Sequence, residues 1–340
     1  MTGSVPHPVF THLLGMTDHR ATFEHAQLSQ PRREHGYCTD DVARVLVVAT
    51  REPDSSPEVN RLAGTALTFL NRAQRHDGTC HNRMSAGGHW TDVPSTDDHW
   101  GRAIWGLGTA AAHSDVSLVR RLATIQFERS AATRSPHLRA TAFAALGAAE
   151  LLSVTPGHPA ALALLTDYAA SVTPATGDAE WPWPEKRLSY ANAVLVEAMI
   201  AAGVALDDPA LRQRGLDLLE WLLGVETADG HLSPTPATGR GPDDRQPGFD
   251  QQPIEVASLA DACARAAATD PSPMWPEGVM AAAAWFQGDN DLGLPMWDPR
   301  TGAGFDGLHS DRVNLNQGAE STLAVISTLQ QARSFVPVPQ

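Results

Sequence analysis

The sequence has little of what marks several large classes of protein. Three cysteines among 340 residues are too few and too scattered for a disulfide framework. No apolar run approaches the roughly 20 residues that span a bilayer. The first sixteen residues lack the basic segment and apolar core of a signal peptide. We therefore expect a cytoplasmic protein without a membrane partner.

Positive charge is also scarce, and cofactor motifs are missing. The formal net charge is −14, which would repel a phosphate backbone and argues against a nucleic-acid partner. No glycine-rich phosphate loop is present, so we expect no nucleotide cofactor. Cys80 and His81 lack the spacing of a zinc site, and the acidic stretch 288–293 lacks the terminal Glu of a calcium loop. We expect no metal.

What the chain does have is alanine-rich helical sequence. Residues that favour strands are sparse, with 3 Tyr and 9 Phe. Six short polar segments, spaced about 40 to 65 residues apart, each precede an apolar helix rich in small residues. The polar segments are 39–44, 97–102, 135–139, 188–192, 250–255 and 316–321. The helices predicted after them are 39–51, 98–112, 136–153, 189–203, 253–268 and 318–332.

Further helices, which are more amphipathic, are predicted between these, so the chain is expected to form helical hairpins. Their ranges are 57–75, 115–129, 158–171, 208–224 and 273–287, with a sixth near 8–16. Ser56-Pro57 and Asp208-Pro209 are typical helix starts. Six hairpins in one domain over residues 1–340 predict an all-α (α/α)6 barrel. The six polar starts would then meet at one end, and the irregular stretch 229–248 would be a loop or lid over it.

Carboxylates are the first candidates for chemistry. Asp40 and Asp41 follow His35 and Tyr37 at one helix start, and Asp98 begins another. Helix N-capping is the alternative role for such residues. Glu255 and Glu320 lie about one turn inside their helices, where they could instead merely complement the helix dipole. Burial would raise the pKa of such a carboxyl group and suit it to general-acid catalysis.

Amides and aromatic rings beside these acids suggest a sugar. An indole can stack on the apolar face of a pyranose, and Trp100, Trp181 and Trp183 precede or begin predicted inner helices, although core packing is the alternative. Arg102 could bind substrate or pair with an acid. The remaining candidate binding residues are His35, Tyr37, Asp40, His99, Glu185, Asp250, Gln251, Gln252, Asn316 and Gln317.

Several strings together resemble a bacterial family of (α/α)6-barrel, glycosidase-like proteins. They are HLLGMTD at 12–18, REHGYCTDDVAR at 33–44, GRAIW at 101–105, FDQQPIE at 249–255, DNDLG at 289–293 and NLNQGAEST at 314–322. Members are often described as glycosyltransferases, because the domain is associated with glycosyltransferase family 4 proteins. The resemblance implies the barrel fold, carbohydrate chemistry and a glycosyltransferase as a candidate partner. This chain departs from the family pattern at Ala191, where the resemblance leads one to expect Asp.

The leading hypothesis is an inverting glycoside hydrolase acting on a neutral oligosaccharide, with mannose-containing chains as one candidate. Its acid and base would be Asp41 and Glu255, with Asp98 and Glu320 in reserve, and carboxyl groups about 6.5–9.5 Å apart. A sugar epimerase or isomerase is the second hypothesis, with His25, His35 and His99 moving protons. A non-catalytic saccharide-binding partner of a glycosyltransferase is the third.

Overall fold

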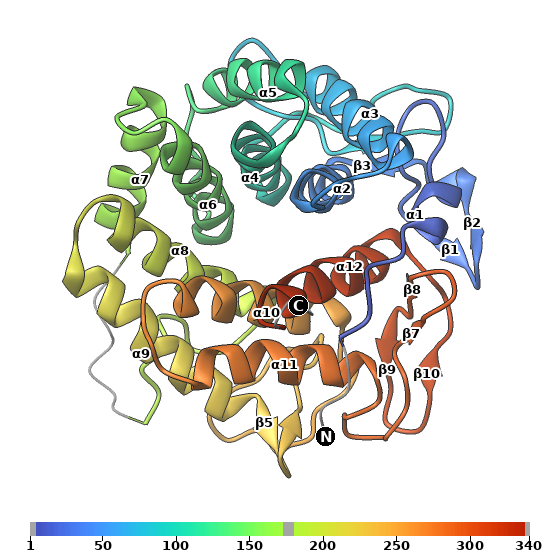
Figure 1. Cartoon of the computed structure of the whole chain (residues 1–340), viewed down its shortest axis with the longest axis vertical. Coiled ribbons are helices and arrows are strands. Elements are labelled where there is room, and N and C mark those ends of the chain that lie inside the picture. Colours follow the sequence, from blue (N-terminus) through green and yellow to red (C-terminus); the bar gives the residue numbers. More distant parts are fainter. Residues whose placement is uncertain (1–4, 173–179, 337–340) are drawn as a thin grey trace.

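A ring of six inner helices forms the centre of the protein. The computed structural model describes residues 5–172 and 180–336, so the termini of the expected 1–340 domain lie outside the described residues. The inner helices are α2 (Thr39–Arg51), α4 (Asp98–His113), α6 (Leu138–Val154), α8 (Asn192–Ala205), α10 (Pro253–Ala267) and α12 (Ala319–Ser334). Each contacts the next, and α12 contacts α2, so the ring closes (Figure 1).

Five outer helices cover the ring, and each packs on the inner helix that precedes it in its hairpin (Figure 1). They are α3 (Pro57–Ala73), α5 (Ser117–Ser130), α7 (Pro159–Ser171), α9 (Pro209–Val225) and α11 (Met274–Phe286). The side chains of Ser56 and Asp208 cap α3 and α9, as their Ser-Pro and Asp-Pro sequences predict. The predicted (α/α)6 fold is thus confirmed.

Small residues allow the inner helices to approach closely, most clearly between α4 and α6. A Cβ atom at Gly108 would lie 2.0 Å from the carbonyl oxygen of Gly147, and one at Gly147 would lie 2.3 Å from that of Ile104. Such distances are far inside van der Waals contact, so neither position admits a side chain without separating the helices. The glycine and alanine richness of the inner-helix sequences is therefore a packing requirement.

The sixth outer position differs from the other five. The helix expected near residues 8–16 is only α1 (Thr11–Gly15), a single turn, because the next residue after Met16, Thr17, forms a β-bridge with Thr22. It contacts α3 and α12, and the hairpin β7–β8 (Trp297–Asp298, Ala303–Gly304) also packs there. The position of the expected element is right, but its length is wrong.

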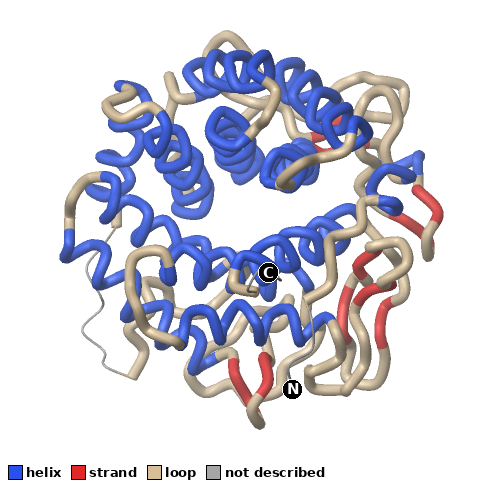
Figure 2. Tube along the Cα trace, in the orientation of Figure 1, coloured by secondary structure: helices blue, strands red, loops and turns tan. Residues whose placement is uncertain are grey.

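In the described part of the chain, strands occur only as short antiparallel pairs (Figure 2). The pairs are β1–β2 (Ala26–Gln27, Gln30–Pro31), β3–β4 (Tyr37–Cys38, Arg83–Met84), β5–β6 (Thr227–Ala228, His231–Leu232) and β9–β10 (Gly307–Leu308, Val313–Asn314), besides β7–β8. A 3₁₀ turn spans Arg33–His35. The β3–β4 pair matters most for function, because it brings residues near 82 to the start of α2.

The stretch 229–248 includes the turn and second strand of the β5–β6 hairpin and is otherwise irregular. Arg240 exchanges two backbone hydrogen bonds with Leu188, so this stretch is fixed beside the start of α8. Its role as a lid stays a prediction. None of the helices described is both long and apolar enough to cross a bilayer.

Candidate functional site

Contacts between side chains join the starts of all six inner helices at one end of the barrel, which we call the mouth. Arg44 of α2 pairs with Glu320 of α12 at 2.8 Å, and Arg102 of α4 reaches Asp40 of α2 at 2.6 Å. The start of α8 is bonded both to Arg139 of α6 and to Glu255 of α10. The six polar segments therefore converge at one end of the barrel, as predicted.

At the α2–α12 side, Asp41 is buried and held by two donors. Its carboxylate accepts from Arg44 at 2.8 Å and from the thiol of Cys38 at 3.1 Å. Burial, opposed by Arg44 and assisted by the charge of Glu320, raises the pKa of Asp41 to about 7. Cys38, not an aspartate, precedes the first residue of α2 and accepts from the Asp41 backbone N–H. Helix capping therefore does not account for either aspartate.

At the α2–α4 side, Asp40 is a fixed anion. One oxygen accepts from Arg102 and the other from Asn82 at 2.9 Å. Burial acts to raise its pKa, but Arg102 and Arg44 outweigh burial and lower the pKa of Asp40 to about 2. Asp98 lies 3.7 Å from the same Arg102, and its charge helps to raise the pKa of Tyr190. Near neutral pH Asp40 is therefore ionised, whereas its neighbour Asp41 is about half protonated.

At the α6–α8–α10 side, Glu255 is 4% exposed and accepts from the backbone N–H of Ala191 at 2.7 Å. Burial, together with the charge of Glu226, raises the pKa of Glu255 to about 8 despite these backbone donors. An acid that only complemented the dipole of its own helix would stay ionised. Glu255 instead binds the start of α8, where Ala191 adopts a left-handed conformation with φ of 46°. That conformation is uncommon for alanine and marks a constrained site.

Arg139 organises the loop before α8. It forms two parallel hydrogen bonds to Glu185, at 2.9 and 2.8 Å, and donates to the carbonyl oxygen of Tyr190 at 2.5 Å. Its guanidinium also lies 4.6 Å from the centre of the Tyr190 ring. The bidentate geometry fixes Arg139 and Glu185 together, so Glu185 is held at the rim of the mouth.

An open cleft of about 710 Å³ lies at the mouth. This volume is in the range typical of small-molecule sites. Four of the predicted site residues line it: Asp40, Asp98, His99 and Glu185. The lining residues that the sequence analysis did not single out as binding residues include Asn82, Arg83, Asp92, Asp97, His137, Arg139 and Tyr190. Asp41, Glu255 and Glu320 do not line this cleft.

Most of these additional residues could not be found from helical periodicity. Asn82 and Asp92 belong to the loop that the β3–β4 pairing brings to α2, and no local pattern signals that pairing. His137, Arg139 and Tyr190 lie within two of the six polar segments, so their position carried a signal. The 135–139 segment has no carboxylate, and Arg139 acts by holding one that another segment supplies.

Other predicted binding residues are packed inside the protein. Trp100 is fully buried and donates to the carbonyl oxygen of Ser130. Trp183 is also fully buried and stacks on Trp221, while Trp181 meets the same ring edge-on. These three indoles have almost no surface on which a sugar could stack. Core packing, the alternative to sugar stacking, therefore describes the surroundings of these three indoles.

Tyr37 and Gln251 are likewise engaged internally. The hydroxyl of Tyr37 donates to Asp18, and burial raises its pKa. The amide of Gln251 donates to Asp291 at 2.5 Å and has no exposed surface. His99 is buried, with its Nε2 atom 2.8 Å from the carbonyl oxygen of Cys80.

The remaining candidates lie near the helix starts with more exposed side chains. Asp250 lies 3.6 Å from His309, and burial raises its pKa. Asn316 accepts from the backbone N–H of Leu28, and Gln317 and Gln252 are half-buried. The ring of His35 contacts that of His25 edge-on, with centroids 5.0 Å apart. None of these five lines the open cleft.

Among the described residues, one group could offer three ligands to a metal: Glu24, Cys38 and Asp41, whose ligand atoms lie within 4.8 Å of one another. Their present partners do not suit a cation. Arg83 and Arg44 pair with Glu24 and Asp41, and burial raises the pKa of the Cys38 thiol, which donates to Asp41. Two guanidinium groups already supply the positive charge that a metal would bring, so the residues do not fit a metal as they stand.

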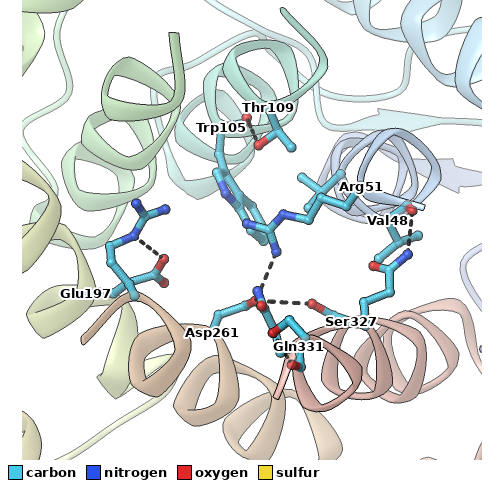
Figure 3. A network of polar contacts seen from close by, with 12 residues as sticks. Val48, Arg51, Trp105, Thr109, Glu197, Asp261, Ser327 and Gln331 are labelled. Atoms are coloured by element: carbon cyan, nitrogen blue, oxygen red, sulfur yellow. Dashed lines mark hydrogen bonds and ion pairs between the residues drawn. The ribbon is translucent and has the colours of Figure 1, made fainter. Parts of the chain in front are cut away.

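The far end of the barrel, where the inner helices terminate, holds a second ionic cluster (Figure 3). Arg51 pairs with Asp261 at 2.9 Å, and Asp261 also accepts from Ser327 and Gln331. Arg265 pairs with Glu150 at 2.5 Å and with Glu197 at 3.0 Å. A cleft of about 780 Å³ lies over this cluster.

The two ends are separated by a nearly filled core. The cavity on the barrel axis measures about 30 Å³ and is bounded by Arg44 toward the mouth and by Glu197 and Asp261 toward the far end. Such a volume holds about one or two water molecules and is far too small for a sugar ring. Any saccharide must therefore bind at an end of the barrel and cannot thread through it.

Comparisons with known proteins support the fold. No family model and no curated protein sequence matches the chain. A sugar epimerase from a ruminal bacterium is 12% identical with a TM-score of 0.69, covering 98% of each chain. A D-mannose isomerase is 10% identical with a TM-score of 0.68, covering 96% of this chain and 95% of that one. A GH76 α-mannanase from Bacteroides thetaiotaomicron is 11% identical with a TM-score of 0.59, covering 88% and 86%. At such low identity the likeness establishes the (α/α)6 fold and nothing finer.

Proposed function

We propose that the protein is a glycoside hydrolase that acts on a neutral oligosaccharide at the mouth of the barrel. The observation that carries the proposal is that the mouth holds carboxyl groups with very different pKa values. The pKa values of Asp41 and Glu255 are raised to about 7 and about 8, while that of Asp40 is lowered to about 2. Carboxyl groups with pKa values pushed apart are what acid–base cleavage of a glycosidic bond requires.

The acid role follows from protonation and the base role from position. Near neutral pH Asp41 is about half protonated and Glu255 is mostly protonated, so these two are the candidates for the general acid that protonates the leaving oxygen. Asp98 lines the cleft and is the candidate for the base that activates water on the opposite face of the sugar. Glu320, held by Arg44, is the reserve carboxylate on the α12 side.

An epimerase or isomerase is the second candidate, favoured by four of the similar structures. It needs histidines free to move protons at the sugar. His99 and His137 line the cleft, but His99 binds a carbonyl oxygen and His137 pairs with Asp97 at 3.1 Å. His25 and His35 touch each other, which leaves no room for a sugar between the two rings. The carboxyl groups therefore support hydrolysis better.

Mannose-containing chains are the first substrates to try, because the names of two similar proteins refer to mannose or mannan. The test incubates the protein with manno-, gluco- and galacto-oligosaccharides and follows new reducing ends and their anomeric configuration by NMR. Glu255→Gln, Asp41→Asn and Asp98→Asn each remove a carboxyl group with little change in shape.

Loss of a general acid or base lowers the rate by roughly 10²–10⁴-fold, and we expect a loss of this size in Asp98→Asn and in at least one of the other two variants. Full activity in both Asp41→Asn and Glu255→Gln would refute the acid assignment. A product with an altered sugar but no new reducing end would identify an epimerase. Binding without turnover would indicate a saccharide-binding partner, for instance of a glycosyltransferase.

A further inference from the structure

Tyr190 is placed differently from every tryptophan that the sequence suggested as a sugar platform. It is 48% exposed. Among the described residues it is the one Phe, Trp or Tyr side chain that lines the mouth cleft. An aromatic ring that is half exposed inside a polar cleft offers an apolar face where a sugar could meet it.

The Tyr190 ring is held in place by Arg139. The guanidinium of Arg139 lies 4.6 Å from the ring centre and also donates to the Tyr190 carbonyl oxygen. Arg139 is itself fixed by two hydrogen bonds to Glu185 and by one to Asn192. The ring therefore has a rigid cationic support, and little freedom is lost when a ligand stacks on it.

The hydroxyl of Tyr190 stays protonated. Burial and the charge of the nearby Asp98 carboxylate raise the pKa of Tyr190 to about 12, so the phenol remains a donor at neutral pH. One residue thus offers both a stacking face and a hydrogen-bond donor to a ligand in the cleft.

The charges around the ring restrict the kind of sugar. Five carboxylates line the cleft, from Asp40, Asp92, Asp97, Asp98 and Glu185. The two arginines of the lining, Arg83 and Arg139, already pair with Glu24 and Glu185. No lining arginine is left without an acid to neutralise an anionic sugar, so the cleft disfavours uronic acids.

We propose that Tyr190 is a substrate-positioning residue, on whose exposed ring a neutral pyranose stacks. The inference rests on the proposed action on saccharides. It adds a residue outside the acid–base set and a preference for neutral over acidic sugars.

The test compares Tyr190→Phe, which keeps the ring, with Tyr190→Ala, which removes it. Val204→Ala is the matched control, because Val204 is 50% exposed near the end of α8, the helix that follows Tyr190. Binding of a manno-oligosaccharide and of an oligogalacturonide is measured by calorimetry, and kcat, KM and the pH–rate profile are measured on any substrate found. Thermal unfolding checks that each variant is folded.

We expect Tyr190→Ala to weaken neutral-sugar binding and raise KM about tenfold, equivalent to about 1.4 kcal/mol. Tyr190→Phe should bind within about twofold of the wild type and keep its KM, because it retains the aromatic ring. Val204→Ala should match the wild type. The oligogalacturonide should bind more weakly than the neutral chain to every variant.

The outcomes separate the two proposals. If the wild type binds neutral sugars and Tyr190→Ala binds them equally well, the positioning role is overturned while the hydrolase proposal stands. If Tyr190→Ala loses binding but the wild type only epimerises its substrate, the platform stands and hydrolysis falls. If the wild type binds no saccharide at all, both are overturned.

Discussion

The mouth and the far end of the barrel both gather acids and arginines, but they pair them differently. At the far end, Glu150, Glu197 and Asp261 each have an arginine nitrogen within 3.0 Å. At the mouth, the arginine nearest to Asp98 is 3.7 Å away. Within the described residues, no arginine or lysine lies within ion-pair distance of Glu255. Two acids of the mouth thus lack a close arginine, whereas each of these three acids at the far end has one.

Helix direction accounts for some of the charges at each end. All six inner helices begin at the mouth, where acids such as Asp40 and Asp98 occupy first turns. They end at the far end, where Arg51 and Arg265 occupy last turns. Both arrangements suit the helix dipole. The dipole favours ionised acids at the mouth, so the raised pKa values of Asp41 and Glu255 show that burial outweighs it there.

The largest expected effect on stability comes from breaking the far-end cluster with Arg265→Met. This change would leave Glu150 and Glu197 buried without their arginine. Loss of one partner of a buried pair costs about 3–5 kcal/mol, and we expect the free energy of unfolding to fall by that amount in urea titrations. Saccharide turnover per folded molecule should stay near the wild-type value.

The control for this change is Arg300→Met, because Arg300 pairs with Asp298 on the surface and its side chain is 87% exposed. Exposed pairs contribute about 0–1 kcal/mol. Equal stability of Arg265→Met and Arg300→Met would show that the far-end pairing does not hold the barrel together.

A smaller effect is expected in the pH dependence of stability. The carboxyl of Glu255 keeps its proton up to about pH 8 in the folded protein, whereas an unfolded Glu loses it near pH 4.3. Between these values the folded state binds more protons, so the Glu255 contribution to stability falls as pH rises. Glu255→Gln should remove a decline of up to about 1.4 kcal/mol per pH unit in this window.

The measurement is chemical unfolding at several pH values between 5 and 8, with Glu185→Gln as the control. Glu185 is already paired with Arg139 and partly exposed. If stability changed with pH at the same slope in the wild type and in Glu255→Gln, the pKa of Glu255 would be normal. The clearest difference between the two ends of the barrel would then be absent.

The sequence predicted the scaffold well because helix signals are local. The small-residue runs and the Ser-Pro and Asp-Pro starts are each encoded within a few residues, and they placed α3 and α9 correctly. The site depends on longer-range contacts. Trp183 precedes an inner helix, as a platform residue would, yet it stacks on Trp221 of α9. Asn82 reaches Asp40 only because β4 pairs with β3. Tertiary packing alone determines the positions of the Trp183 and Asn82 side chains.

The smallest expected effect is that of Glu320→Gln at the mouth. The Glu320 side chain is 43% exposed and pairs with Arg44, which retains Asp41 as a second partner. Solvent screening limits such a pair to about 1 kcal/mol or less, so unfolding should barely change. Activity should respond instead. Burial is the main reason that the pKa of Asp41 is raised, but the charge of Glu320 adds to it.

Glu320→Gln should therefore lower the pKa of Asp41 and move the corresponding limb of the pH–rate profile to lower pH. Glu58→Gln, which breaks the exposed Arg61 pair on α3, should leave that limb in place. A stability loss above about 2 kcal/mol would mean that the mouth pairs are as firmly coupled as buried ones. A stable variant with a shifted limb would instead show that charge at the mouth acts on proton exchange, while charge at the far end acts on folding.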